Sequence, residues 1–184
     1  MEKNRERLKT SMQMLTVLAL LMAAQVVLGM LEVFHNDTVK LTLSFIPVVM
    51  AARLYGGTGG AVVAGFGDII SYLIHPVGAW VPQITLTYAL IGVIYGWFLH
   101  KKTGMVRIVL SVVVTQCVIS LFVTSLWLTM LSITEGTPFV EFYWTKVGMR
   151  ILQCVVMSVV QIIVIPPMLR LMDRVGNTKP MAVH

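Results

Sequence analysis

The chain has 184 residues, of which 57% are hydrophobic and only 12% are charged, and its mean hydropathy is +0.85. Soluble domains carry about 25% charged residues, so this composition excludes a soluble globular protein. The formal net charge is +6, but the basic residues gather at the ends of apolar segments, as in membrane proteins. We therefore expect an integral membrane protein in the lipid bilayer, with residues 1–184 as one transmembrane domain and no nucleic-acid partner.

Six apolar segments alternate with polar or glycine-rich stretches, which predicts an all-α protein with six transmembrane helices. The expected helices are residues 10–31, 41–54, 60–74, 80–99, 107–133 and 144–171. A helix needs about 20 apolar residues to span the bilayer, so the second helix is short, and Pro47 is expected to kink it. The cluster YGGTGG at residues 55–60 predicts a reversal of the chain, and residues 32–40 read as a polar loop.

The distribution of lysine and arginine predicts that both termini are cytoplasmic. With six spans and the N-terminus inside, only Lys40 and Lys146 fall on the outer side. Eleven basic residues fall on the inner side: Lys3, Arg5, Arg7, Lys9, Arg53, Lys101, Lys102, Arg107, Arg170, Arg174 and Lys179. This asymmetry satisfies the positive-inside rule.

Small residues recur at four-residue spacing in three of the predicted helices. The pairs are Ala19 with Ala23, Gly60 with Ala64, Ala61 with Gly65, and Gly92 with Gly96. Small residues let helices approach closely in lipid, where no hydrophobic force drives helices together. Spacing alone predicts that all four pairs serve internal packing.

Two charged residues fall inside predicted spans, where charge is costly and faces a cavity or a partner. Asp68 lies eight residues after Gly60 and is compatible with either a structural acid or a ligand contact. Arg150 lies four residues after Lys146, on the same helical face. Two neighbouring cations repel unless an anion lies between them, and either the acidic residues of the loops or a carboxylate of a ligand could supply that anion.

Aromatic residues cluster near the predicted outer surface, at Phe34, Trp80, Trp127, Tyr143 and Trp144. They fit either an interfacial belt or rings that stack on a flat ligand, and Trp127 fits the second role best. No nucleotide-binding G-x-x-x-x-G-K-S/T loop, H-E-x-x-H zinc motif or G-x-S-x-G nucleophile motif is present. The chain is therefore expected not to be an enzyme.

Several segments occur in a characteristic order: Ala19-x-x-x-Ala23, the run KLTLSFIP at 40–47, YGGTGGAVVAGFGD at 55–68, HPVGAW at 75–80, ALIGVIYG at 89–96, SLWL at 125–128, and Arg150. Taken together, they resemble the substrate-binding S components of energy-coupling factor (ECF) vitamin transporters, in particular the folate type. The resemblance implies a bacterial cell-membrane protein that captures a vitamin from outside. It further implies docking through Ala19 and Ala23 onto a transmembrane coupling subunit driven by two cytoplasmic ATPases, with no cofactor or metal in the S component.

The resemblance and the charge pattern agree on a flat, aromatic and anionic ligand, for which folate is the leading candidate. Lys40, Lys146 and Arg150 would hold its carboxylates by charge-assisted hydrogen bonds. The predicted remainder of the site is Trp127 with Trp80 or Trp144 stacked on the ring, together with Asp68 and His75. The alternatives are another small aromatic vitamin or a queuosine-type precursor, a self-contained channel or secondary carrier, and a scaffold protein without a ligand pocket.

Overall fold

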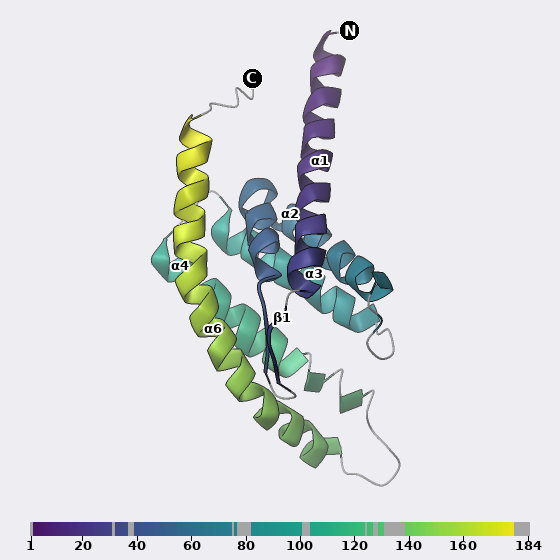
Figure 1. The fold of residues 1–184 in the computed structure, drawn as a ribbon, viewed down its shortest axis with the longest axis vertical. Coiled ribbons are helices and arrows are strands. Elements are labelled where there is room, and N and C mark those ends of the chain that lie inside the picture. Colours follow the sequence, from purple (N-terminus) through teal and green to yellow (C-terminus); the bar gives the residue numbers. More distant parts are fainter. Residues whose placement is uncertain are drawn as a thin grey trace. The chain divides into compact units, whose positions relative to one another are not determined.

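The structure is a computed structural model, and it describes the backbone of most of the chain. The described residues are 2–30, 32–36, 39–74, 76, 82–100, 104–123, 125–126, 129–130 and 139–178. The elements are, in order, α1 (Glu2–Met30), β1 (Glu32–Asn36), β2 (Val39–Thr42), α2 (Phe45–Ile74), α3 (Pro82–Leu99), α4 (Met105–Val113), η1 (Val114–Val123) and α6 (Phe139–Thr178). They divide into two compact units, Met1–His100 and Lys101–His184 (Figure 1).

Four helices in the described part of the chain are long and apolar enough to cross a membrane. Their spans are Ser11–Met30, Phe45–Ile74, Pro82–Leu99 and Gln153–Arg174, and Met105–Cys117 is a shorter apolar helix. These helices confirm the prediction of a helical protein that crosses the membrane several times. The first helix begins at Glu2 rather than at residue 10.

α2 consists of two helical arms that meet at Gly56. The backbone of Gly56 has φ 74° and ψ −161°, a conformation that residues with a Cβ rarely adopt. Gly29 of α1 lies near both Ser44 and Ser71, so the two ends of α2 lie together. The chain therefore reverses at Gly56, as the sequence predicted for residues 55–60.

The prediction of a kink at Pro47 is wrong. α2 begins at Phe45, which places Pro47 in the first helical turn rather than in the interior. The first backbone N–H groups of a helix have no acceptor within the helix, so a proline there breaks no hydrogen bond. Pro82 opens α3 in the same way.

α2 and α3 touch through their backbones. A Cβ atom on Gly60 would overlap the carbonyl oxygen of Gly92, and one on Gly92 would overlap Gly60 in return. One turn away, a Cβ on Gly96 would overlap the backbone of Gly57. These pairs confirm that the glycines of α2 and α3 serve internal packing, and their order shows that the second arm of α2 runs antiparallel to α3.

Arg53 links the reversal in α2 to the end of α3. Its Nη1 donates a hydrogen bond to the carbonyl oxygen of Leu99 (3.0 Å), and Nδ1 of His100 lies 3.3 Å from the carbonyl oxygen of Arg53. The last carbonyls of a helix have no partner within the helix. Arg53 therefore caps α3 in addition to the surface role that the sequence suggested.

α1 packs against the second arm of α2 through a buried amide. Gln25 is 8% exposed and lies across Gly67, where a Cβ would overlap the amide. Its Nε2 lies 3.5 Å from the carbonyl oxygen of Ala64, to which it donates. Polar side chains of this kind hold helices together in lipid. The sequence analysis did not single out Gln25.

The segment expected to be a polar loop at residues 32–40 is instead an antiparallel hairpin. β1 and β2 pair in a register that places His35 opposite Lys40 and Asn36 opposite Val39. Phe and Val residues favour strands, and backbone pairing satisfies the N–H and C=O groups that a loop would leave to water. The hairpin gives the backbone of Lys40 a defined position.

In the Lys101–His184 unit, α6 packs against both α4 and η1. η1 continues α4 with π-helical turns, which are rare and are often found at functional sites. α6 has 40 residues, or about 60 Å at 1.5 Å per residue, so it extends beyond a hydrocarbon core of about 30 Å. It is longer at both ends than the predicted helix at 144–171.

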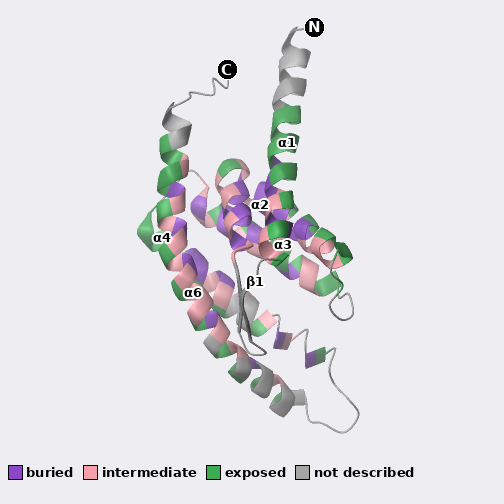
Figure 2. Cartoon of the chain, in the orientation of Figure 1, coloured by how far each residue is buried: buried purple, intermediate pink, exposed green. Residues whose placement is uncertain are grey.

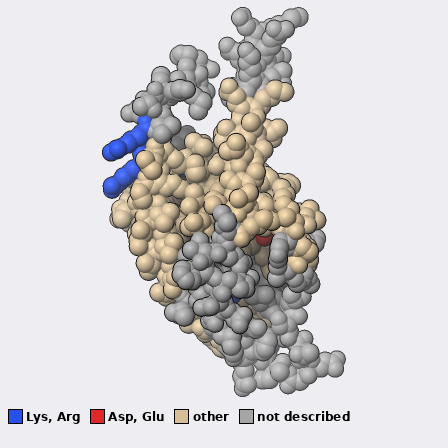
Figure 3. Space-filling model, viewed as in Figure 1, with Lys and Arg blue, Asp and Glu red and all other residues tan. Residues whose placement is uncertain are grey.

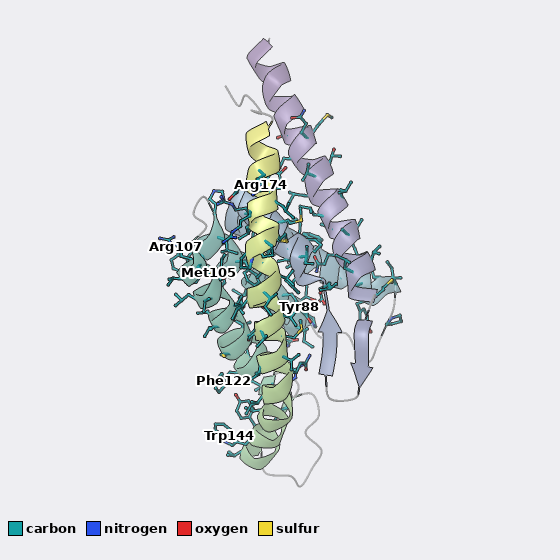
Figure 4. The ribbon with its side chains drawn as sticks, turned by 60° about the vertical axis from the view of Figure 1, so that its left-hand side comes forward. Tyr88, Met105, Arg107, Phe122, Trp144 and Arg174 are labelled. Carbon is teal, nitrogen blue, oxygen red and sulfur yellow. The ribbon has the colours of Figure 1, made fainter. Side chains whose placement is uncertain are left out.

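The basic end of this unit carries exposed arginines. Arg107, Arg170 and Arg174 are exposed, and Figure 3 shows basic side chains gathered together on the surface. Figure 4 places Arg107 at the start of α4 and Arg174 near the end of α6, at the same end of the unit. Phe122 and Trp144 lie toward the opposite end (Figure 4).

Replacing Gly92 by alanine should destabilise the protein, because the new Cβ would overlap the backbone of Gly60. We expect a loss of about 1–3 kcal/mol, the usual cost of overpacking, measured by thermal unfolding in detergent. Gly148→Ala is the matched control, since Gly148 is helical, exposed and has nothing within 4 Å of the added atom. A Gly92→Ala protein as stable as the control would contradict the backbone contact.

Candidate functional site

An apolar groove runs along α1 beside the second arm of α2. It has a volume of about 490 Å³ and is lined by seven residues of α1 and by Val62, Ile70 and Ile74 of α2. Ala19 and Ala23 are among the lining residues, and both are exposed. Figure 2 shows exposed residues along α1, in contrast to the buried residues of α2. The two alanines are therefore not used for packing between the described helices.

Small residues at the groove would let a further helix approach α1 closely, since close backbone contact is what holds helices together in lipid. A second apolar groove, of about 400 Å³, lies between the second arm of α2 and α3. Val62 lines both grooves, so they open on adjoining faces. The lining of both grooves is almost entirely apolar.

Asp68 is tied to α3. Its Oδ2 accepts a hydrogen bond of 2.7 Å from Oγ1 of Thr85, and both residues are half-buried. A carboxylate within a span is costly unless a polar group compensates it, so this contact favours the structural role that the sequence left open. The sequence analysis missed Thr85. The antiparallel register of Gly60 with Gly92, continued by two turns, leads from Asp68 to Thr85.

Trp144 and Arg150 are the predicted ligand-binding residues of α6 whose side chains are described. Trp144 is 60% exposed, and its ring lies 5.8 Å from that of Tyr143 at an interplanar angle of 71°. Arg150 is half-buried. Lys146 lies on the same continuous helix, one turn before Arg150, but its side chain is outside the described set. The helix thus keeps Lys146 and Arg150 on one face.

The remaining predicted site residues are not described in full. Lys40 has a described backbone in β2 but no described side chain, and His75, Trp80 and Trp127 lie outside the described residues. Asp68 belongs to the Met1–His100 unit, whereas Trp144 and Arg150 belong to the Lys101–His184 unit. Among the described side chains, no group of three His, Cys, Asp or Glu residues could hold a metal ion.

Comparison with known proteins gives a similarity in sequence and a similarity in structure. The folate transporter FolT of Clostridium novyi (strain NT) is 27% identical over 116 residues, which are 62% of this chain and 67% of that protein. The crystal structure of FolT bound with folic acid matches with a TM-score of 0.70 at 24% sequence identity, covering 83% of this chain and 88% of the FolT chain. The structural match shows that the two proteins share a fold.

A family profile decides the classification. The profile described as "ECF-type riboflavin transporter, S component" matches residues 9–170, which includes every described membrane span except the last few residues of α6. The resemblance to ECF S components and the expectation of a transport protein are confirmed. Because the match extends over most of the chain, the protein belongs to the ECF-type riboflavin transporter S component family, whose members are transport proteins and not enzymes.

Proposed function

We propose that the protein is the folate-binding S component of a bacterial ECF importer and captures folate or a related pterin outside the cell membrane. The observation that carries the choice of ligand is the similarity to a folate transporter over 116 residues. The shared fold with FolT bound with folic acid supports it. The partners would be a transmembrane coupling subunit and two cytoplasmic ATPases.

We further propose six spans with both termini in the cytoplasm. The two arms of α2 count as two spans, and together with α1, α3, α6 and the helix that begins with α4 they give six. The exposed arginines at the start of α4 and the end of α6 (Arg107, Arg170 and Arg174) support a cytoplasmic position for that end. The opposite end, which carries Phe122 and Trp144 (Figure 4), would then face outward.

The ligand site is proposed to combine cations with aromatic rings at the outer end. Arg150 and Lys146 on α6 and Lys40 on the hairpin would hold the carboxylates, because guanidinium and ammonium groups form strong charge-assisted bonds with carboxylates. Trp127, with Trp80 or Trp144, would stack on the ring, and His75 would lie nearby. Asp68 is assigned a structural role because Thr85 already engages its carboxylate.

Riboflavin is the second candidate ligand, because the matching family profile carries that name. Riboflavin is also flat and aromatic but lacks a carboxylate, so the cations near the outer end favour folate. Binding to the purified protein in detergent should separate the two. We expect folic acid to bind below micromolar concentration in isothermal titration calorimetry and riboflavin to bind much more weakly; the reverse order would reassign the protein to riboflavin.

Replacing Arg150 by alanine should weaken the binding of folic acid by about 1.5–3 kcal/mol, the range for a hydrogen bond to a charged group. The loss should be absent for a pterin without the glutamate tail, because only the tail carboxylates would contact Arg150. Arg170→Ala is the control, since Arg170 is exposed at the basic end. Equal affinities of the wild-type and Arg150→Ala proteins for folic acid would remove Arg150 from the site.

Replacing Ala19 by tryptophan should abolish ATP-driven uptake of folic acid by the complete transporter while leaving binding to the isolated protein intact. The indole would fill the groove in which a coupling helix is proposed to dock. Leu20→Trp is the control, because Leu20 is also exposed on α1 (68%) but does not line the groove. If Ala19→Trp also abolishes binding, Ala19 serves packing and not docking.

A further inference from the structure

Side-chain hydroxyls in this protein follow a common pattern. Seven of them donate to a backbone carbonyl three or four residues earlier in the chain: Thr16 to Met12, Thr58 to Tyr55, Thr87 to Gln83, Ser111 to Ile108, Thr115 to Ser111, Thr129 to Ser125, and Ser158 to Cys154. The lipid interior offers no water to satisfy a polar group. A hydroxyl on a membrane helix therefore turns back to its own backbone or, as Thr85 does with Asp68, donates to a side chain of a neighbouring helix.

Ser125 departs from this pattern. Its side chain is fully buried (0% exposed), and its Oγ has no hydrogen-bond partner within the described protein. Its own carbonyl oxygen is engaged by Oγ1 of Thr129 at 2.8 Å. A buried hydroxyl without a partner is destabilising by about 1–3 kcal/mol in folded proteins. A ligand that supplies the partner would remove this penalty.

The position of Ser125 fits a ligand contact. It follows Phe122 by three residues in the sequence, and Figure 4 places Phe122 toward the end of the unit that is opposite Arg107 and Arg174. This is the end proposed to face outward, where the vitamin would be captured. Ser125 also precedes by two residues Trp127, which is proposed to stack on the vitamin ring.

We propose that the Ser125 hydroxyl forms a hydrogen bond with the polar edge of the vitamin's fused ring and thereby helps to select the ligand. This inference rests on the proposed function. The hydroxyl can donate to a ring nitrogen or carbonyl and can accept from an amino group, and a pterin offers both along one edge. A buried hydroxyl of this kind discriminates against rings that lack the matching group, because it is then left without a partner.

Two measurements on the Ser125→Ala protein test this assignment. The Kd for folic acid should rise about threefold to tenfold, the effect of one neutral hydrogen bond. The unfolding temperature of the ligand-free protein should stay the same or increase, because the substitution removes a buried polar group without a partner. A purely structural hydroxyl predicts the opposite pair, with lower stability and an unchanged Kd.

Ser111→Ala is the matched control, since Ser111 is equally buried but donates to its own helix at 2.8 Å. It should leave the Kd unchanged. An unchanged Kd for Ser125→Ala, or a loss of stability in the ligand-free protein, would overturn the role of Ser125. The proposed function would still stand in that case, provided that the wild-type protein binds folic acid. If the wild type binds riboflavin instead, the same comparison is made with riboflavin, and binding of neither vitamin would overturn both.

Discussion

The contact between the backbones of Gly60 and Gly92 determines the arrangement of the Met1–His100 unit. Two helices in lipid gain little from hydrophobic burial against each other, so their association depends on close packing and on polar contacts between them. At this crossing no side chain lies between α2 and α3. The antiparallel register that follows brings Arg53 to the end of α3 on one side of the crossing and Asp68 to Thr85 on the other.

The bilayer core holds no water to bind polar groups, and this explains where several polar side chains of this protein lie. Arg53 caps carbonyls that α3 cannot satisfy, Thr85 supports the carboxylate of Asp68, and Gln25 connects α1 to the backbone of α2. Each of these contacts joins two elements. In each case a polar side chain of one helix is satisfied by a group of a neighbouring helix.

The sequence predicted those features that depend on local spacing. Glycine clusters indicated the reversal at Gly56 and the packing of α2 and α3, because both need a missing Cβ. The partner of Asp68 could not be predicted, since the sequence of one helix does not show which residues of another helix pack against it. The strands at residues 32–42 were missed because charged and polar residues there obscured a weak strand preference.

The sequence selected candidate site residues by their type, but it could not predict which groups they contact. Charges inside apolar segments identified Asp68 and Arg150, and small residues identified Ala19 and Ala23, because all are unusual in a lipid-facing chain. Spacing alone assigned the alanines to internal packing, whereas the structure leaves them exposed on a groove. The ligand contacts of all the proposed binding residues stay predictions: Lys40, His75, Trp80, Trp127, Trp144, Lys146 and Arg150.

The glycine crossing also limits how this protein can change over generations. Every amino acid other than glycine carries a Cβ, and a Cβ at Gly60 or Gly92 overlaps the opposite backbone. A substitution on one helix cannot be offset by a smaller residue on the other, since glycine is already the smallest. The two positions are therefore closed to gradual drift, whereas the exposed faces of the same helices remain open to it.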